Sequence, residues 1–61
     1  MKRRALERHM RRYGCQKRRE GGKHTIWRNP DNGATAPVPR HSEIADVLAR
    51  RICRELGIPP P

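Results

Sequence analysis

The stretch HTIWRNPDNG, residues 24 to 33, predicts a β-strand that ends in a tight hairpin loop. Its first half combines threonine, isoleucine and tryptophan, which are residue types that favour strands. Pro30 suits the start of a turn, and Asn32 and Gly33 suit the positive φ angles that hairpin loops need. The chain is therefore expected to reverse here and to form an antiparallel neighbour.

The segments on either side supply the other strands. Residues 34 to 40, ATAPVPR, predict a short third strand. Pro37 and Pro39 cannot donate hydrogen bonds to a neighbour, so this strand should lie at a sheet edge or carry a bulge. Residues 15 to 20, CQKRRE, predict the weakest strand, because Cys15 is its one apolar residue.

Helical patterns occupy both ends of the chain. Residues 2 to 13 place Leu6, Met10 and Tyr13 on one stripe, and Gly14 suits the end of that helix. A second helix is predicted from apolar residues at helical spacing, which are Ile44, Val47, Leu48, Ile52 and Leu56. Ser42 and Asp46 both fit its N-cap, and Gly57 with the prolines after it fits its end.

The order α-β-β-β-α predicts an α+β fold. Three antiparallel strands with both helices on one face would bury one side of the sheet and leave the other open. Sixty-one residues are close to the lower limit for independent folding, which predicts a single domain over residues 1–61. Stability is then expected to gain from a partner or from dimerisation.

Positive charge is concentrated in the first half of the chain. Residues 1 to 28 hold eleven Lys and Arg residues against Glu7 and Glu20, whereas residues 29 to 61 balance to zero within a total of +9. A segregated positive field attracts polyanions, which favours nucleic acid over a merely solvated basic surface. There is no apolar run for a membrane span and no signal-peptide pattern, so a cytoplasmic protein with reduced Cys15 and Cys53 is expected.

Strand parity leaves two arrangements open for residues 24 to 28. His24 and Ile26 share one face, and Thr25 and Trp27 share the other. If Ile26 packs under the helices, Trp27 lies on the open face, where it could stack a base. If Trp27 is the core residue, Ile26 faces outward, and core packing is favoured for a lone tryptophan.

A histidine at the entrance of this strand needs an explanation. His24 follows Gly21, Gly22 and Lys23, a position where a buried strand would carry an aliphatic residue. One interpretation is a histidine at the rim of the core. The other is an exposed side chain that exchanges protons near neutral pH, for which the adjacent glycine turn argues.

Three segments together resemble a known family. EGGKHTIWRNP (20–30), VPRH (38–41) and LARRICRELGIP (48–59) are similar to the HicA family of type II toxin–antitoxin systems, and the likeness runs from Met1 to Pro59. The resemblance implies a double-stranded-RNA-binding-domain-like fold, mRNA interferase activity, a HicB-like antitoxin partner and a catalytic role for His24. Departures from the family occur in the first strand, where Gln16, Lys17 and Arg18 replace aliphatic residues, and at Lys23 and Pro37.

The implied chemistry needs few groups. RNA carries its own nucleophile, the 2′-hydroxyl, so His24 as general base and a grip on the phosphate suffice, with a 2′,3′-cyclic phosphate as product. No metal or other cofactor is expected, because the His and Cys residues lack ligand spacing. His41 is either the general acid or a turn residue, and His9 is expected at the surface. The predicted RNA-binding residues are Gly21, Gly22, Lys23, Arg19, Arg28, Arg8 and Arg11.

Two other functions fit the same basic face. One is an RNA-binding module without catalysis, and the other is a small structural protein of a ribonucleoprotein. Simple binding does not need a histidine in the Gly21–His24 turn, so the turn favours the ribonuclease.

Overall fold

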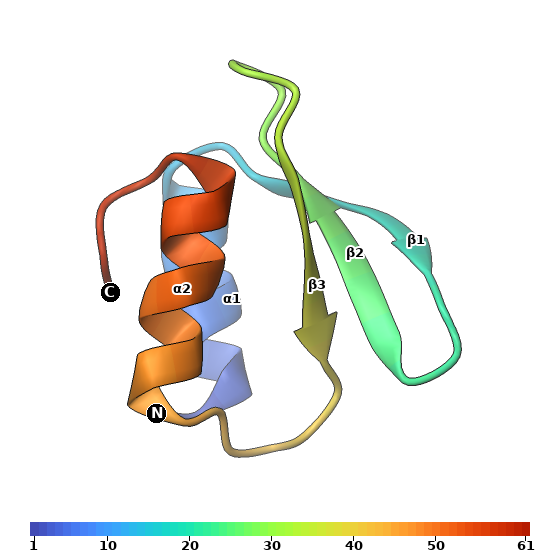
Figure 1. The fold of residues 1–61 in the computed structure, drawn as a ribbon, viewed down its shortest axis with the longest axis vertical. Coiled ribbons are helices and arrows are strands. Elements are labelled where there is room, and N and C mark those ends of the chain that lie inside the picture. The colour runs from blue at the N-terminus through green and yellow to red at the C-terminus, as the bar shows by residue number, and fades with distance from the viewer.

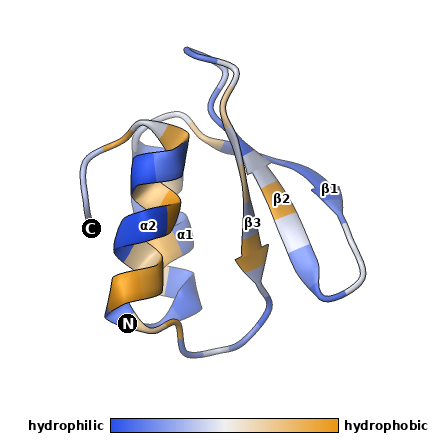
Figure 2. Cartoon of the chain, in the orientation of Figure 1, coloured by the Kyte–Doolittle hydropathy of each residue, from blue (hydrophilic) through white to orange (hydrophobic).

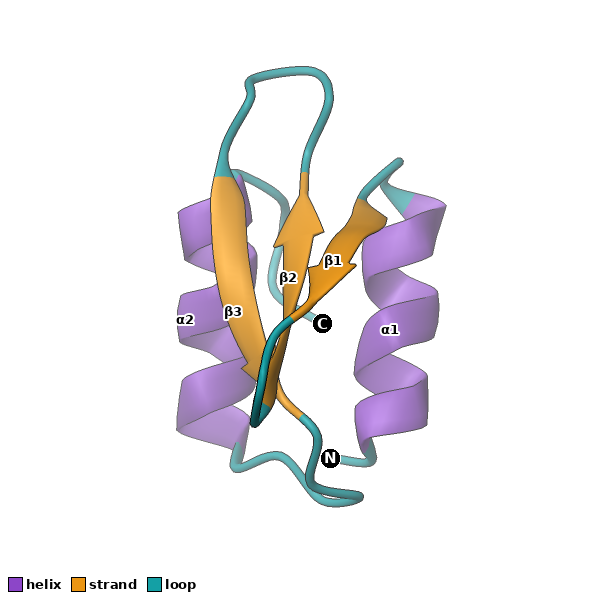
Figure 3. Cartoon of the chain, turned by 90° about the vertical axis from the view of Figure 1, so that its right-hand side faces the viewer, coloured by secondary structure: helices purple, strands orange, loops and turns teal.

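The computed structural model describes residues 1–61 and has the predicted element order. The elements are α1 (Arg3–Arg12), β1 (Gln16–Glu20), β2 (His24–Arg28), β3 (Thr35–Pro39) and α2 (Asp46–Leu56). The two helices lie side by side on one face of the sheet, and the other face is open (Figures 1 and 3). The predicted α+β fold, with a three-stranded antiparallel sheet and two helices on one face, is confirmed.

The sheet has β2 at its centre, with β1 and β3 as antiparallel edge strands. Edge placement explains how β3 accommodates Pro37 and Pro39, which pair with Ile26 and His24. The irregularity in the sheet lies instead in β1, where the register shifts between Lys17 and Arg19. This bulge was not predicted.

Trp27 is the centre of the core. It is fully buried and Thr25 is 5% exposed, whereas His24 is exposed and Ile26 is half-buried on the open face. The favoured arrangement is therefore confirmed, and the alternative with Trp27 on the open face is wrong. His24 consequently projects from the face that the helices do not cover.

Most of the remaining core comes from one stripe on each helix and the inner side of β3 (Figure 2). The buried apolar set is Leu6, Met10, Cys15, Trp27, Ala36, Val38, Ile44, Ala49, Ile52, Cys53, Leu56 and Ile58. Cys15 and Cys53 are free thiols, and burial raises the pKa of both. Neither helix is long and apolar enough to span a bilayer.

Several local expectations for the helices were wrong. Tyr13, at the end of α1, and Val47, on α2, are exposed, at 40% and 71%. On α2, Ala49 and Cys53 are buried instead of Val47. The N-cap of α2 is Ala45, which has no side-chain oxygen to offer, so neither Ser42 nor Asp46 caps the helix. Ile44 lies before the helix, yet it is buried.

The polar strand β1 forms although all five of its residues are exposed. Its Lys17 pairs with Trp27 and places its ammonium 5.9 Å from the centre of the indole ring. From α1, the guanidinium of Arg11 lies 5.2 Å from the same ring. The long side chains of Lys17 and Arg11 thus cover the tryptophan, and their methylene stems supply apolar contact. Lys17 is one of the residues that depart from the aliphatic pattern of the family that the sequence resembles. The indole N–H has no hydrogen-bond partner.

Candidate functional site

The turn between β1 and β2 carries His24 and is closed by its own backbone. The Gly21 N–H donates to the His24 carbonyl at 2.7 Å. A Cβ at position 21 would lie 3.0 Å from that same oxygen, so the closure favours glycine there. The His24 backbone is thereby fixed while its side chain stays exposed.

Arg40, directly after β3, holds this turn from the other side. Its guanidinium donates to the carbonyls of Gly22 (3.1 Å) and His24 (3.5 Å) and, in a short contact, to that of Gly21. It also forms an ion pair with Glu20 at 2.8 Å. One side chain therefore fixes the turn relative to the segment that follows β3, across a sequence separation of 16 to 19 residues.

These contacts leave a pocket of about 380 Å³, which we call the His24 pocket. It is lined by Gly22, Lys23, His24, Arg40 and His41. The lining contains two imidazoles and two cations; the Glu20 carboxylate lies outside it, paired with Arg40, so Lys23 is the unpaired cation that favours an anion there. The sequence raised His41 as one of two alternatives, and the structure brings it into the same pocket as His24.

The imidazoles of His24 and His41 make no hydrogen bond within the protein, in contrast to His9. The Nε2–H of His9 donates to the Pro59 carbonyl at 2.8 Å, and its ring packs on Tyr13. His9 is half-buried at the surface, as expected, and its exposed hydrogen bond holds the C-terminal segment against α1. The two pocket histidines are free to contact a ligand.

Gly22 differs from the other glycines of the turns in having no steric reason to be glycine. A Cβ there would meet nothing within 4 Å, and its φ lies outside the positive range. The missing side chain instead leaves space at the wall of the His24 pocket.

The predicted RNA-binding arginines are spread over the molecule. Arg19 pairs with Ile26, so it shares the open face with His24, the face toward the viewer in Figure 3. Arg28 lies on the same face but at the far end of β2, beside Gly33. Arg8 is an exposed residue of α1 without an acidic partner, whereas Arg11 is engaged by Glu7 at 3.9 Å and by Trp27.

A second basic pocket, of about 370 Å³, adjoins this region and was missed by the sequence reasoning. We call it the N-terminal pocket; Lys2, Arg3, Arg4 and Ser42 line it. The Arg3 guanidinium donates to the Arg40 carbonyl, so one hydrogen bond links a lining residue of each pocket. The run of three cations at residues 2 to 4 was the available signal, but its proximity to His24 depends on long-range contacts.

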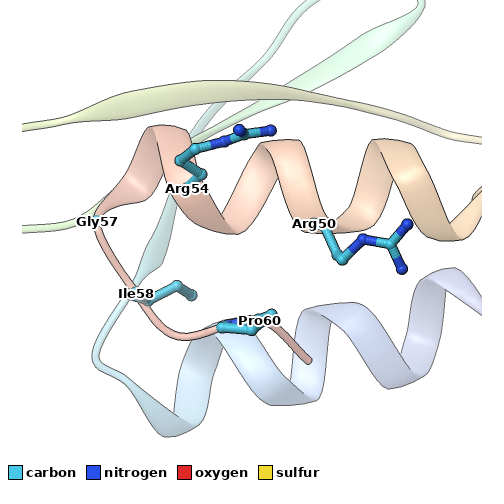
Figure 4. Close-up of a pocket in the computed structure, with 5 residues that line it drawn as sticks. All are labelled: Arg50, Arg54, Gly57, Ile58 and Pro60. Atoms are coloured by element: carbon cyan, nitrogen blue, oxygen red, sulfur yellow. The ribbon is translucent and has the colours of Figure 1, made fainter.

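A third pocket lies at the C-terminal end of α2 (Figure 4). It is larger, about 520 Å³, and Arg50, Arg54, Gly57, Ile58 and Pro60 line it. Its titratable groups are two guanidiniums, which remain protonated and offer no acid or base. The His24 pocket, by contrast, is lined by two imidazoles.

No group of three or more His, Cys, Asp or Glu residues is positioned to hold a metal ion. Acidic partners are also scarce around the basic first half. Lys2, Arg3 and Arg11 form ion pairs there, and the other eight cations of residues 1 to 28 have none. The positive field predicted from the sequence is thus largely uncompensated.

Comparison with known proteins gives one match. Residues 3–58 match the family model of the HicA toxin of bacterial toxin–antitoxin systems, which covers nearly the whole chain. No curated protein and no solved structure matches the chain.

Proposed function

The chain belongs to the HicA toxin family, the toxin half of a bacterial toxin–antitoxin pairing, and from this premise we propose that it is an mRNA interferase. In this proposal, residues 1–61 act as one domain that cleaves RNA in the cytoplasm without a metal ion. The observation that carries the proposal is the His24 pocket, where free imidazoles and cations line a space without carboxylates.

The chemistry follows from what RNA supplies. His24 accepts the proton of a 2′-hydroxyl, and the resulting oxyanion attacks the adjacent phosphorus and displaces the 5′-oxygen. A positioned base of this kind contributes about 10²–10⁴-fold to the rate. Lys23 and Arg40 lie in the same pocket, where they would stabilise negative charge as it builds on the phosphoryl oxygens.

The route of the RNA is proposed from the positions of the exposed cations and of the glycine turn. Lys23 borders the His24 pocket, and Arg19 shares the open face with His24. Gly21 and Gly22 allow the RNA backbone to approach the turn closely. Arg3 and Arg4 extend the positive surface into the N-terminal pocket, and Arg8, Arg11 and Arg28 contribute to the general positive field.

The test is cleavage of a long RNA by the purified chain in the presence of a chelator. We expect fragments that end in a 2′,3′-cyclic phosphate and a 5′-hydroxyl. RNA that is bound but remains intact would contradict the proposal and would favour an RNA-binding module. Cleavage that disappears with the chelator would refute the metal-independent mechanism.

We further propose a HicB-like antitoxin as the partner that completes the pairing. The uncompensated positive charge favours a partner that presents acidic groups to the basic surface or covers His24. A partner that recognises the folded toxin alone also raises its melting temperature. Co-expression should relieve growth arrest and yield a co-purifying complex; unrelieved arrest without co-purification would contradict this.

A further inference from the structure

We propose that His41 is the general acid that protonates the leaving 5′-oxygen, opposite His24 as the base. The inference rests on the proposed ribonuclease function and assigns a second catalytic residue to the same pocket. It starts from the convergence of two separate segments, the turn before β2 and the chain after β3, on one space of about 380 Å³.

The position of His41 relative to His24 is constrained by its neighbour. Arg40 binds the carbonyls of Gly21, Gly22 and His24, so the backbone that carries His41 is fixed to the turn that carries His24. The Arg40 carbonyl in turn accepts from Arg3. The Ser42 carbonyl also accepts the Arg3 backbone N–H at 2.9 Å, so both ends of the short segment around His41 are tethered, while its side chain is exposed and unbonded.

The other groups in the pocket are poor proton donors at neutral pH. A guanidinium does not release its proton in proteins, which excludes Arg40. A lysine ammonium is in general a much weaker acid than an imidazolium, which argues against Lys23. Gly22 has no side chain. Among the lining residues, His41 is thus the one whose residue type changes charge between pH 5 and 8, apart from His24 itself.

The step balances with two histidines. The neutral imidazole of His24 takes the 2′-hydroxyl proton as the bond between O2′ and phosphorus forms. The bond between phosphorus and O5′ breaks, and the imidazolium of His41 gives its proton to O5′. The products are a 2′,3′-cyclic phosphate and a 5′-hydroxyl, and both imidazoles regain their starting states by proton exchange with water.

A sulfur leaving group separates the two roles. The probe is an oligonucleotide that contains a cleavage site mapped with the wild-type protein, with sulfur in place of the bridging 5′-oxygen at that site. A thiolate leaves without protonation, so loss of the acid matters for the oxygen substrate alone. We expect His41→Ala to cleave the oxygen substrate at least about a hundredfold more slowly than wild type and the sulfur substrate at nearly the wild-type rate.

Matched variants make the outcome decisive. His24→Ala should be slow on both substrates, and Lys23→Ala should lose the same factor on both, because neither removes the acid. His41→Gln serves as a second variant, and melting curves check that each protein is folded. The inference is overturned if His41→Ala matches wild type on the oxygen substrate or is equally impaired on both. Failure of the wild-type protein to cleave any RNA would overturn the proposed function together with this inference.

Discussion

The turn at one end of β2 and the loop at its other end use polar groups in opposite ways (Figure 1). In the β2–β3 loop, the side-chain amides of Asn29 and Asn32 both donate to the Leu56 carbonyl at the end of α2, at 2.8 and 3.1 Å. Their oxygens accept the N–H groups of Asp31 and Ala34. The amide N–H groups thus attach the loop to the helix, and the amide oxygens bond the backbone of the loop itself.

The β1–β2 turn is held just as firmly, but its own side chains are left free. Arg40 binds the backbone carbonyls of the turn, while the side chains of Lys23 and His24 are exposed and form no hydrogen bond or ion pair in the protein. Polar groups that serve the fold are satisfied within it, and charged groups that are not satisfied are available to a ligand. The comparison therefore gives the loop a role in stability and agrees with the proposed catalytic role of the turn.

The largest expected effect is on the turn side of this comparison. His24→Ala should reduce RNA cleavage at least about a hundredfold, because it removes the proposed base. The melting temperature should hardly change, since the side chain is exposed and makes no hydrogen bond. RNA cleavage and thermal melting of the same preparation provide the measurement. Retained cleavage, or early melting that indicates a structural histidine, would contradict the assignment.

Asn29→Ala should show the reverse pattern. Asn29 is 4% exposed and bonds the end of α2, so its removal takes one of two side-chain donors from the Leu56 carbonyl and the acceptor from the Asp31 N–H. We expect a loss of about 1–3 kcal/mol in the free energy of unfolding. For a domain of this size, each kcal/mol lowers the melting temperature by about 4–8 °C. Denaturant or thermal unfolding measures this, and an unchanged midpoint would contradict the role given to the loop.

Two glycine substitutions sharpen the contrast. Gly57→Ala should cost about 1–2 kcal/mol, because φ is +73° and a Cβ would lie 2.5 Å from the Asn32 amide nitrogen. Gly22→Ala should change stability by less than about 0.5 kcal/mol, because its Cβ has open space. Cleavage by Gly22→Ala should nevertheless fall, since a methyl group enters the His24 pocket. Full activity in that variant would show that RNA does not use this wall.

The smallest effect is expected for RNA affinity. Arg4→Glu and Arg54→Glu change the net charge equally, but Arg4 lines the N-terminal pocket and Arg54 lies near the end of α2. Arg4→Glu should weaken binding more and lower the salt slope by about 0.9 for each phosphate that the variant no longer neutralises. Arg11 is unsuitable for this test because it contacts Trp27. Equal weakening by both variants would show that RNA affinity depends on the net charge alone and not on where the charge lies.

The sequence predicted those features that local patterns encode. Residue types and turn chemistry were sufficient for β2, the hairpin loop and the glycine ends of both helices. Of the two residues expected to have positive φ in the loop, Gly33 alone has it, at +74°, and Asn32 instead uses its side chain as a hydrogen-bond partner. Strand parity alone allowed either Ile26 or Trp27 to face the core, because a shift of one residue exchanges the two faces of a strand.

The composition of the candidate site depends on contacts that no local pattern encodes. Arg40 meets the glycine turn across 16 to 19 residues, and Arg3 meets Arg40 across 37. Sequence spacing therefore indicated His24 but left His41 undecided, and it missed Arg40 and the N-terminal pocket. Similarly, both predicted N-caps of α2 were wrong: Ala45 is the N-cap, and the Asp46 carboxylate instead accepts from the Met1 amine at 3.0 Å, across 45 residues.

The most direct test measures the wild-type protein, His24→Ala and Asn29→Ala in one experiment. Cleavage of a long RNA is followed in chelator at a temperature where all three are folded, and their unfolding midpoints are compared. The account predicts that His24→Ala is stable and inactive, and that Asn29→Ala is less stable but cleaves at the wild-type rate per folded molecule. Loss of activity and stability together in both variants would contradict the division between a catalytic turn and a structural loop.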